Sequence, residues 1–253
     1  MSTRVALVTG GGMGIGAATC RLLADQGARV AIGDIDEKAA KVVAGDLAGK
    51  GHAALHADVT DEASVAALFS KVESDMGPIA ILVCVAGGPL ITPDYRPRIS
   101  QMSVDHWEKT DALNARGTFL CVREFLRLRE KAPVPDGRIV ALSSMAGLTA
   151  GQSETDAAYS ASKAAIIGLM RNAAIQGAAC GITANAIAPG LIDTPGVHYG
   201  TTQEQRDGAA KVAPLRRLGR DGEVAAMIAF LASPQASYVT GQTIGVNGGR
   251  HMN

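Results

Sequence analysis

The chain has 253 residues, of which 47% are hydrophobic and 19% are charged, and its formal net charge is zero. This balance is typical of a folded globular protein, and it excludes a polyelectrolyte and gives no basic surface that would favour nucleic acid or anionic lipid. No repeat, low-complexity tract or linker divides the sequence, so we expect residues 1–253 to form one large domain.

The cysteines and histidines show no pattern typical of disulfides or metal sites. The four cysteines are scattered without a CxxC pair, which is typical of thiols in a reducing compartment. The five histidines form no cluster with metal-ligand spacing, so no metal is predicted. No apolar run is long enough to cross a bilayer, and the first residues lack signal-peptide organisation. We therefore expect a cytoplasmic protein with no membrane partner.

The first predicted unit is a strand, a glycine-rich turn and a helix, at residues 5–8, 9–16 and 17–26. Glycines allow positive φ and a close approach of the backbone to a pyrophosphate, and the helix N-terminus offers free N–H groups. Glycine clusters also occur in plain turns, but the flanking strand and helix favour a phosphate-binding loop. Its predicted cofactor-binding residues are Gly10, Met13, Gly14, Ile15 and Gly16.

The second predicted strand, residues 29–33, leads into Asp34, which lies 18 residues beyond Gly16. In dinucleotide-binding folds an acidic residue at this place binds the adenosine ribose hydroxyls, and its charge repels a 2′-phosphate. Neither Met13 nor Ile35, which flank the expected position, is basic. The alternative is that Asp34 caps the next helix, for which Asp36 is equally suited. We favour the ribose role, and therefore NAD over NADP.

Alternating strands and helices continue along the chain. Strands are predicted at 52–57, 79–84, 138–143, 182–188 and 242–246, and helices at 36–49, 60–75, 104–131, 156–180 and 223–232. This order predicts an α/β, Rossmann-type fold: a doubly wound parallel sheet of about seven strands with helices on both faces and ligands at the strands' carboxyl ends. Asp58 and Val59 follow one such strand, and Ala86 and Gly87 follow the next, so we assign all four to the cofactor site.

Two segments show no regular pattern. Residues 89–104 contain three prolines and are predicted to form a surface loop. Residues 191–219 contain two prolines and lack strong periodicity, which favours an irregular substrate-binding loop or lid.

The predicted helix at 104–131 contains Asn114 and Gly117, both mildly unfavourable in a core helix. The pair suggests a local distortion that holds water near the site, although a satisfied core asparagine is the ordinary alternative.

Tyr159 and Lys163 lie four residues apart, so a helix places them on one face, one turn apart. A free phenol has a pKa of ~10, and a fixed ammonium within ~4–6 Å lowers it toward the neutral range. Ser144, after the preceding strand, can offer a hydroxyl to the same substrate oxygen. The alternative is that Lys163 is a solvated surface residue.

Taken together, these signals resemble the short-chain dehydrogenase/reductase family over essentially the whole chain. The matching residues are Thr9, Gly10, Gly14, Gly16, Asp34, Asp58, Val59, Asn114, Ser143, Ser144, Tyr159, Lys163, Pro189, Gly190, Thr194, Val246, Asn247, Gly248 and Gly249. The resemblance implies that Tyr159 is the general acid/base, that Lys163 lowers its pKa and binds the nicotinamide ribose, and that Ser144 orients the substrate oxygen. It implies further that Asn114 holds the water of a proton relay. Pro189, Gly190, Ile192 and Thr194 would contact the cofactor.

The sequence departs from the family pattern at two places. Cys84-Val85 stands where the family usually has Asn-Asn, which removes a side-chain amide that bonds to the sheet. Ser144 lies 15 residues before Tyr159, two more than the commonest spacing, and we expect the extra residues within 147–156 to reshape the substrate pocket.

The leading hypothesis is an NAD-dependent dehydrogenase that interconverts a secondary alcohol and its ketone. Two alternatives stay open: an NADPH-dependent 3-oxoacyl-thioester reductase, against which Asp34 and Met13 argue, and a non-catalytic nucleotide-binding scaffold or sensor. A mostly apolar predicted wall hints at a small cyclic, aromatic or aliphatic alcohol. Its residues include Leu90, Met145, Gln152 and Tyr199. The resemblance also implies a homotetramer, with helices 104–131 and 156–180 at one interface.

Overall fold

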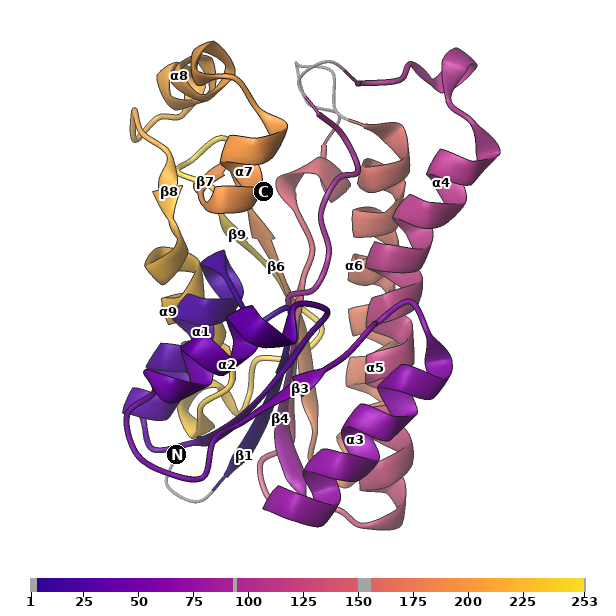
Figure 1. Ribbon diagram of the computed structural model, residues 1–253, viewed down its shortest axis with the longest axis vertical. Helices are drawn as coiled ribbons and strands as arrows, with labels where there is room; N and C mark the ends of the chain where they lie inside the picture. The colour runs from indigo at the N-terminus through magenta and orange to yellow at the C-terminus, as the bar shows by residue number, and fades with distance from the viewer. Residues whose placement is uncertain (1–3, 93–94, 150–155, 253) are drawn as a thin grey trace.

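A seven-stranded parallel sheet forms the centre of the molecule (Figure 1), as the sequence predicts. The computed structural model describes residues 4–92, 95–149 and 156–252. The strands run in the order β3-β2-β1-β4-β5-β6-β9, which is the order of a doubly wound fold. They are β1 (Val5–Thr9), β2 (Arg29–Asp34), β3 (Ala53–His56), β4 (Ile79–Cys84), β5 (Arg138–Leu142), β6 (Thr183–Pro189) and β9 (Thr243–Val246).

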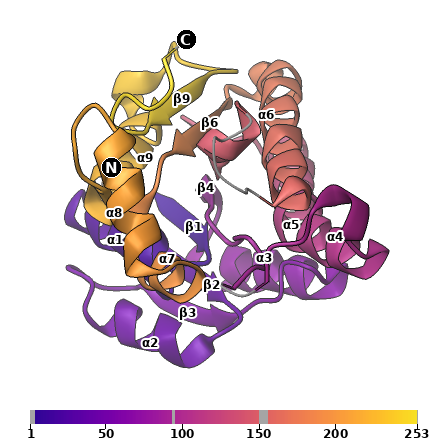
Figure 2. The same ribbon diagram turned by 90° about the horizontal axis from the view of Figure 1, so that it is seen from above.

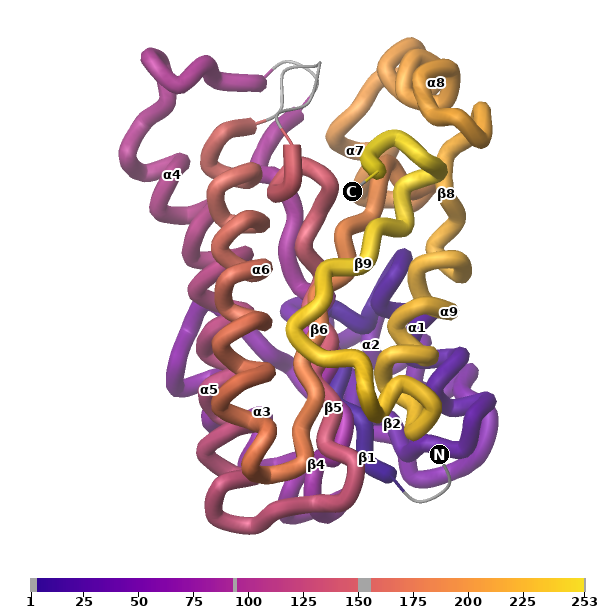
Figure 3. Tube along the Cα trace, turned by 180° about the vertical axis from the view of Figure 1, so that it is seen from behind, coloured from indigo at the N-terminus to yellow at the C-terminus, as the bar shows by residue number. Residues whose placement is uncertain are grey.

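Helices cover both faces of this sheet (Figures 2 and 3). One face carries α1 (Gly14–Asp25), α2 (Glu37–Gly45) and α9 (Asp221–Leu231). The other carries α3 (Glu62–Met76), α4 (Val104–Asp111), α5 (Gly117–Lys131) and α6 (Ala157–Gly177). No helix among the described residues combines the length and the apolar character that a membrane span requires.

The central strands are apolar throughout because both of their faces are buried. In β1, Val5 and Leu7 point into the core beneath α3, α5 and α6, while Ala6 and Val8 point into the core beneath α1, α2 and α9. This arrangement explains the continuous apolar runs of β1 and β4, since a parallel sheet covered on two sides leaves no polar face.

The register of the parallel strands brings the functional loops to one edge. Thr9 pairs with Gly33 on one side and with Cys84 on the other, and Ala141 pairs with Cys84 and Ala186. The glycine-rich turn and the segments after β2, β4, β5 and β6 therefore all leave the sheet at its carboxyl edge.

The predicted helix at 104–131 is interrupted where Asn114 lies. The structure has α4, a π-helical turn (Ala112–Arg116) and then α5. The predicted local distortion is thus confirmed. The helix predicted at 36–49 ends earlier, at Gly45, and the one predicted at 156–180 ends at Gly177 in a short 3₁₀ turn (Ala178–Cys180).

The prediction of a long irregular segment at 191–219 was wrong in large part. This segment, here called the lid, contains β7 (Ile192–Asp193), α7 (Pro195–Gly200), α8 (Gln203–Val212) and β8 (Gly219–Arg220), whose strands pair with each other. Thr194 caps α7, and Thr202 with Gln205 forms a capping box on α8. These caps define helices that a weak hydrophobic periodicity does not reveal.

Segment 89–104 is mostly a surface loop, as predicted. Its described part contains a bridge between Thr92 and Tyr95 and one 3₁₀ turn (Ile99–Gln101). Two further 3₁₀ turns lie at Met145–Gly147 and Pro234–Ala236.

Candidate active site

The glycine loop is packed so closely that side chains cannot enter it. Gly10 and Gly14 have φ of 72° and 50°, in the region that favours glycine. A Cβ on Gly16 would lie 1.9 Å from the Gly10 carbonyl oxygen, and one on Gly10 would lie 2.6 Å from the backbone of Ala86. The loop therefore presents bare backbone at the sheet edge, which fits a pyrophosphate.

The N-terminus of α1 next to this loop has no side-chain cap and no acidic residue in its first turn. By contrast, Asp36 caps α2 and Asp61 caps α3. Together with the bare glycine loop, the uncapped N–H groups and the positive end of the helix dipole form a place for the phosphates of a dinucleotide.

Asp34 faces the glycine loop and does not cap α2. Its carboxylate accepts hydrogen bonds from the backbone N–H of Gly12 at 2.8 Å and of Asp36 at 3.0 Å. Asp36 provides the cap, because its carboxylate accepts from Lys38 N and Ala39 N. The structure thus rules out the capping alternative for Asp34, and its role in binding a ribose stays a prediction. No pattern in the sequence predicted the hydrogen bond between Asp34 and Gly12.

Met13 and Ile35 are both more than half exposed, in the segments that bond to Asp34. Ile15 is the second residue of α1 and packs against the core beneath it. Asp58 accepts hydrogen bonds from the backbone and hydroxyl of Thr60, and Val59 is buried against Gly117. Contacts of these residues with a cofactor stay predictions.

Ser144, Tyr159 and Lys163 meet above the carboxyl ends of β4 and β5. Ser144 is the hydrogen-bonding partner that acts to lower the pKa of Tyr159. Lys163 Nζ lies 5.5 Å from the centre of the Tyr159 ring and donates to the Leu142 carbonyl at 2.8 Å. A Cβ on Gly87 would lie 3.3 Å from Lys163 Nζ. Lys163 is only 3% exposed, so it is not the solvated surface residue of the alternative interpretation.

Burial dominates the electrostatics of this pair. It raises the pKa of Tyr159 to about 12, against which the Ser144 hydrogen bond acts, and it lowers the pKa of Lys163 to about 7. The expected lowering of the phenol pKa by a fixed ammonium is therefore absent from this structure, because removing both groups from water favours their neutral forms.

Asn114 is fully buried and holds the segment after β4. Its side-chain oxygen accepts from Gly88 N at 2.9 Å, and its amide donates to the carbonyls of Gly88 and Thr110. The structure thus shows both features that the sequence suggested for Asn114: the helix is distorted there, and the asparagine side chain is fully hydrogen-bonded in the core. Holding a water stays a prediction.

Backbone hydrogen bonds hold the turn after β4, where Cys84-Val85 stands in place of the Asn-Asn that the resemblance leads one to expect. The N–H groups of Val85 and Ala86 both donate to the Thr9 carbonyl, which fixes the turn after β4. A hydrogen bond with Cys121, together with burial, raises the pKa of the Cys84 thiol. Cys84 therefore behaves as a buried, neutral core residue beneath the site.

The turn after β6 brings the lid to the glycine loop. Gly190 N donates to the Val246 carbonyl at 3.0 Å, and a Cβ on Gly190 would lie 3.0 Å from Asn247 Cα. A Cβ on Gly14 would lie 3.4 Å from the Thr194 side chain. The predicted cofactor residues Pro189, Gly190, Ile192 and Thr194 thus lie on the same edge of the sheet as the glycine loop.

Comparison with known proteins agrees with this geometry. Residues 10–251 match a family model described as Enoyl-(Acyl carrier protein) reductase. A cis-4-hydroxycyclohexanecarboxylate dehydrogenase from Sinomonas cyclohexanicum is 43% identical over 97% of this chain and 96% of its own length. A short-chain type dehydrogenase/reductase from Mycobacterium marinum has a solved structure with a TM-score of 0.92 and 30% identity, covering 100% of this chain and 97% of that one. The chain belongs to the short-chain dehydrogenase/reductase family.

Other relatives of this short-chain dehydrogenase/reductase are named for different activities. A 3-oxoacyl-(acyl-carrier-protein) reductase from Salmonella typhimurium is 35% identical over 98% of both chains. Members of the family bind a nicotinamide cofactor, and the glycine loop, Asp34 and the uncapped N-terminus of α1 are the residues here that would hold one.

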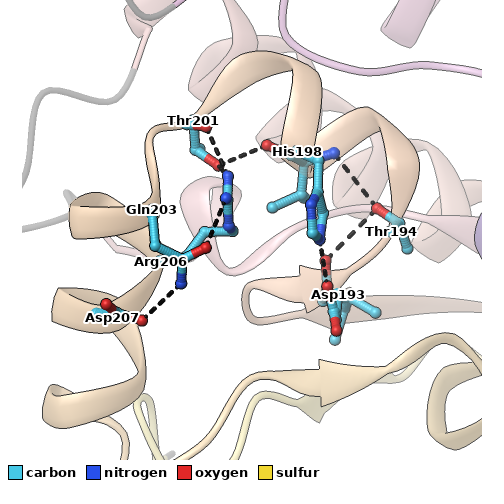
Figure 4. A network of polar contacts seen from close by, with 9 residues as sticks. Asp193, Thr194, His198, Thr201, Gln203, Arg206 and Asp207 are labelled. Atoms are coloured by element: carbon cyan, nitrogen blue, oxygen red, sulfur yellow. Dashed lines mark hydrogen bonds and ion pairs between the residues drawn. The ribbon is translucent and has the colours of Figure 1, made fainter.

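On the substrate side, the lid is held together by side-chain contacts (Figure 4). His198 and Asp193 form an ion pair at 2.5 Å, and both are more than half exposed. Arg206 donates to the carbonyl of Thr201 and to Gln203, which in turn donates to Asp207. Across the lid edge, Arg96 of the 89–104 loop donates to the Gly200 carbonyl at 2.8 Å.

The predicted substrate residues lie in three segments around the reaction centre. Leu90 is partly exposed after β4, Met145 follows Ser144, and Tyr199 is mostly exposed in α7. Gln152 lies outside the described residues. A cavity of about 130 Å³ is lined by residues of the segments 190–192, 209–223 and 246–250 and not by Tyr159. Among the described residues, no group of three His, Cys, Asp or Glu side chains could hold a metal ion.

Proposed function

We propose that the chain is an NAD-dependent oxidoreductase that interconverts a secondary alcohol and its ketone, with Tyr159 as the general acid/base. The observation that carries this proposal is the buried Lys163, whose Nζ lies 5.5 Å from the centre of the Tyr159 ring, together with Ser144, which acts to lower the pKa of Tyr159. Lys163 Nζ lies next to Gly87, where an added Cβ would be only 3.3 Å from it.

The chain's own residues orient the substrate and move its proton. The hydroxyls of Ser144 and Tyr159 can both bond to the substrate oxygen. A bound nicotinamide cofactor supplies or accepts the hydride. Lys163 is placed to bond the cofactor ribose, and Asn114 to hold the water of a proton relay.

The raised pKa of Tyr159 and the lowered pKa of Lys163 determine which protonation states have to change during the reaction. In ketone reduction, neutral Tyr159 donates its proton, which its raised pKa of about 12 allows. In alcohol oxidation, Tyr159 has to accept a proton as a phenolate. Before it can do so, the Tyr159 hydroxyl has to ionise. Ionisation of Tyr159 and protonation of Lys163 favour each other, because opposite charges attract strongly in a buried site.

The preference for NAD rests on Asp34. Its carboxylate lies against Gly12, where a 2′-phosphate on the ribose would meet a negative charge. This argues against the second candidate, an NADPH-dependent 3-oxoacyl-thioester reductase, which is favoured by the 35% identity with the Salmonella reductase. Asp36 adds a second negative charge nearby, and neither Met13 nor Ile35 offers a cation.

For the substrate, we favour a small cyclic secondary alcohol over an acyl thioester. The support is the 43% identity with a dehydrogenase named for a hydroxycyclohexanecarboxylate and the apolar character of Leu90 and Met145. Two assays separate the candidates. One tests a panel of alcohols, including cis-4-hydroxycyclohexanecarboxylate, with NAD and NADP, and the other tests acetoacetyl-CoA with NADH and NADPH. Turnover of acetoacetyl-CoA with NADPH alone would favour the second.

Replacing Tyr159 with Phe tests the mechanism. We expect the rate to fall by at least ~10²-fold, because general acid–base catalysis typically contributes that much. NADH binding, measured by fluorescence, should change little. Tyr238→Phe is the matched control, since Tyr238 is fully exposed. Equal turnover by wild type and Tyr159→Phe would exclude the mechanism. NADH binding without turnover of any substrate would favour a sensor or scaffold.

We also propose a homotetramer in the cytoplasm. Helices α4, α5 and α6 carry exposed large apolar side chains, and such exposure favours an interface between copies. They are Val104, Trp107, Phe119 and Ile175. Light scattering after gel filtration gives the mass directly, and Trp107→Glu should dissociate the assembly if this face is an interface.

A further inference from the structure

A buried histidine–aspartate contact outside the catalytic set lies at the start of α6. His106 Nε2 and Asp156 Oδ2 are 2.9 Å apart, and their side chains are 7% and 0% exposed. In every other ion pair among the described residues, at least one partner is more than a fifth exposed. A carboxylate buried this deeply is costly unless both oxygens are bonded.

Both oxygens of Asp156 are bonded, and each bond has a different consequence. Oδ1 accepts from Ala158 N at 3.1 Å and so caps α6. Oδ2 ties that cap to His106 on α4, the helix that packs beside α6 (Figure 2). The Asp156 carbonyl also accepts from Ser160 N. Tyr159 lies in the first turn of α6, so the contact with α4 fixes the position of that turn.

His106 also contacts the loop before its own helix. The Tyr95 ring meets the imidazole edge-on, with 5.4 Å between ring centres. The backbone N–H of His106 donates to Ser103 Oγ, which caps α4. One imidazole thus joins three segments around the reaction centre: the loop after β4, α4 and the first turn of α6.

Capping α6 does not by itself require an aspartate that also bonds to His106. Serine caps helices about as well as aspartate and would leave no buried charge. What the His106–Asp156 bond adds is a directional constraint between two helices, 50 residues apart in the chain.

We propose that His106 and Asp156 are positioning residues: they fix the first turn of α6 so that the Tyr159 hydroxyl stays bonded to Ser144, and they hold the Tyr95 loop against the site. This inference deepens the proposed function and rests on it for the reaction that Tyr159 carries out. Neither residue is assigned a contact with substrate or cofactor.

Asp156→Ser tests the constraint while keeping a helix cap. We expect kcat to fall by about 10- to 100-fold, because small misplacements of catalytic groups have effects of this size. The probe reaction is NAD with the best alcohol of the panel, at temperatures well below the melting point of each variant. The dissociation constant of NADH should stay within about twofold, because the glycine loop and Asp34 are unchanged.

His106→Phe should give the same pattern, since it keeps the ring against Tyr95 but cannot bond to Asp156. Asp156→Asn should recover most of the rate, because an amide can both cap α6 and bond to the imidazole. Lys109→Gln is the matched control: it removes an exposed ion pair with Asp105 on the same helix and should leave kcat unchanged.

Wild-type kcat in Asp156→Ser, with only a lower melting temperature, would overturn the proposal and leave the pair a purely stabilising feature. Crystal structures of wild type and Asp156→Ser provide a measurement independent of turnover. The proposal expects the Tyr159–Ser144 hydrogen bond to be lost in the variant, and an unchanged bond contradicts it. If wild type turns over no substrate, the proposed function fails, and this structural comparison still decides the positioning role.

Discussion

The cofactor side and the substrate side of this protein are built in different ways. On the cofactor side the backbone itself forms the site: Gly16 touches the Gly10 carbonyl, and Asp34 is bonded to two backbone N–H groups. On the substrate side the lid is joined by exposed side chains, such as the His198–Asp193 pair, which are 53% and 57% exposed. A site made of backbone tolerates almost no substitution, whereas contacts between exposed side chains can change at little cost in stability.

The two sides meet at Gly14 and Thr194, and the buried reaction centre lies with them at the same edge of the sheet. Lys163 has features of both sides: it is a side chain, but it is enclosed like the backbone of the glycine loop, while Tyr159 beside it is half-buried. The relevant variable is therefore burial rather than the type of group, and the following substitutions test that view.

Gly16→Ala should have the largest effect. Its Cβ would lie 1.9 Å from the Gly10 carbonyl oxygen, so the loop has to rearrange, and we expect a loss of ~5 kcal/mol or more in the free energy of unfolding, or no folded protein. Gly208→Ala in α8 is the matched lid variant. Nothing lies within 4 Å of its Cβ, and a helical Gly→Ala change stabilises by about 0.5–1 kcal/mol. Urea unfolding of both variants checks the contrast, and similar effects of the two would refute it.

Lys163→Met should give the next largest effect, with a defined pH dependence. Because burial lowers the pKa of Lys163 from 10.5 to about 7, the folded protein binds fewer protons than the unfolded chain between these values. The stability of wild type contributed by this group therefore rises with pH through that window. We expect the variant to be inactive but more stable, by about 3 kcal/mol below pH 7 after allowing for the lost bond to Leu142.

This advantage of Lys163→Met should shrink as the pH rises, vanish at about pH 9.5 and reverse above about pH 10.5, where only the lost bond to Leu142 remains. Chemical denaturation of wild type and variant between pH 6 and pH 10 measures the difference. A difference that does not vary with pH would mean that Lys163 is charged in the folded protein.

Asp34→Ala should change cofactor preference with little effect on folding. Removing the carboxylate leaves Gly12 N without its bond but ends the repulsion of a 2′-phosphate, so we expect at least ~10-fold relative improvement in the use of NADP over NAD. Asp36→Asn is the matched control: it keeps the α2 cap and should leave the preference closer to that of wild type. Kinetics with both cofactors measure the ratio, and an unchanged ratio in Asp34→Ala would remove the basis for the NAD assignment.

His198→Gln should have the smallest effect. The pair with Asp193 is exposed, and exposed ion pairs contribute ~1 kcal/mol or less. We expect the melting temperature to change little and the effect on KM to exceed that on kcat, because we assign the lid a role in binding substrate and none at the reacting bond. A large loss of stability would show that the lid is held as tightly as the glycine loop.

Much of the fold follows from local patterns in the sequence. Val5, Ala6, Leu7 and Val8 are apolar because both faces of β1 are covered, and that run identifies the strand without reference to the rest of the chain. The glycine loop is recognisable because only glycine fits its backbone. Tyr159 and Lys163 share a face because helical spacing requires it. The cofactor loop and the catalytic helix were therefore predictable.

Other features depended on contacts between distant segments. The two short helices of the lid begin at caps formed by Thr194 and Thr202, which apolar periodicity does not detect. The raised pKa of Tyr159 and the lowered pKa of Lys163 come from enclosure by several elements. His106 and Asp156 are 50 positions apart and carry no joint motif. The sequence by itself determined which backbone could form strands, turns and helices, because those preferences are local. Only the tertiary structure decided which charged groups lost their water and which partners they met, because burial is a property of the whole fold.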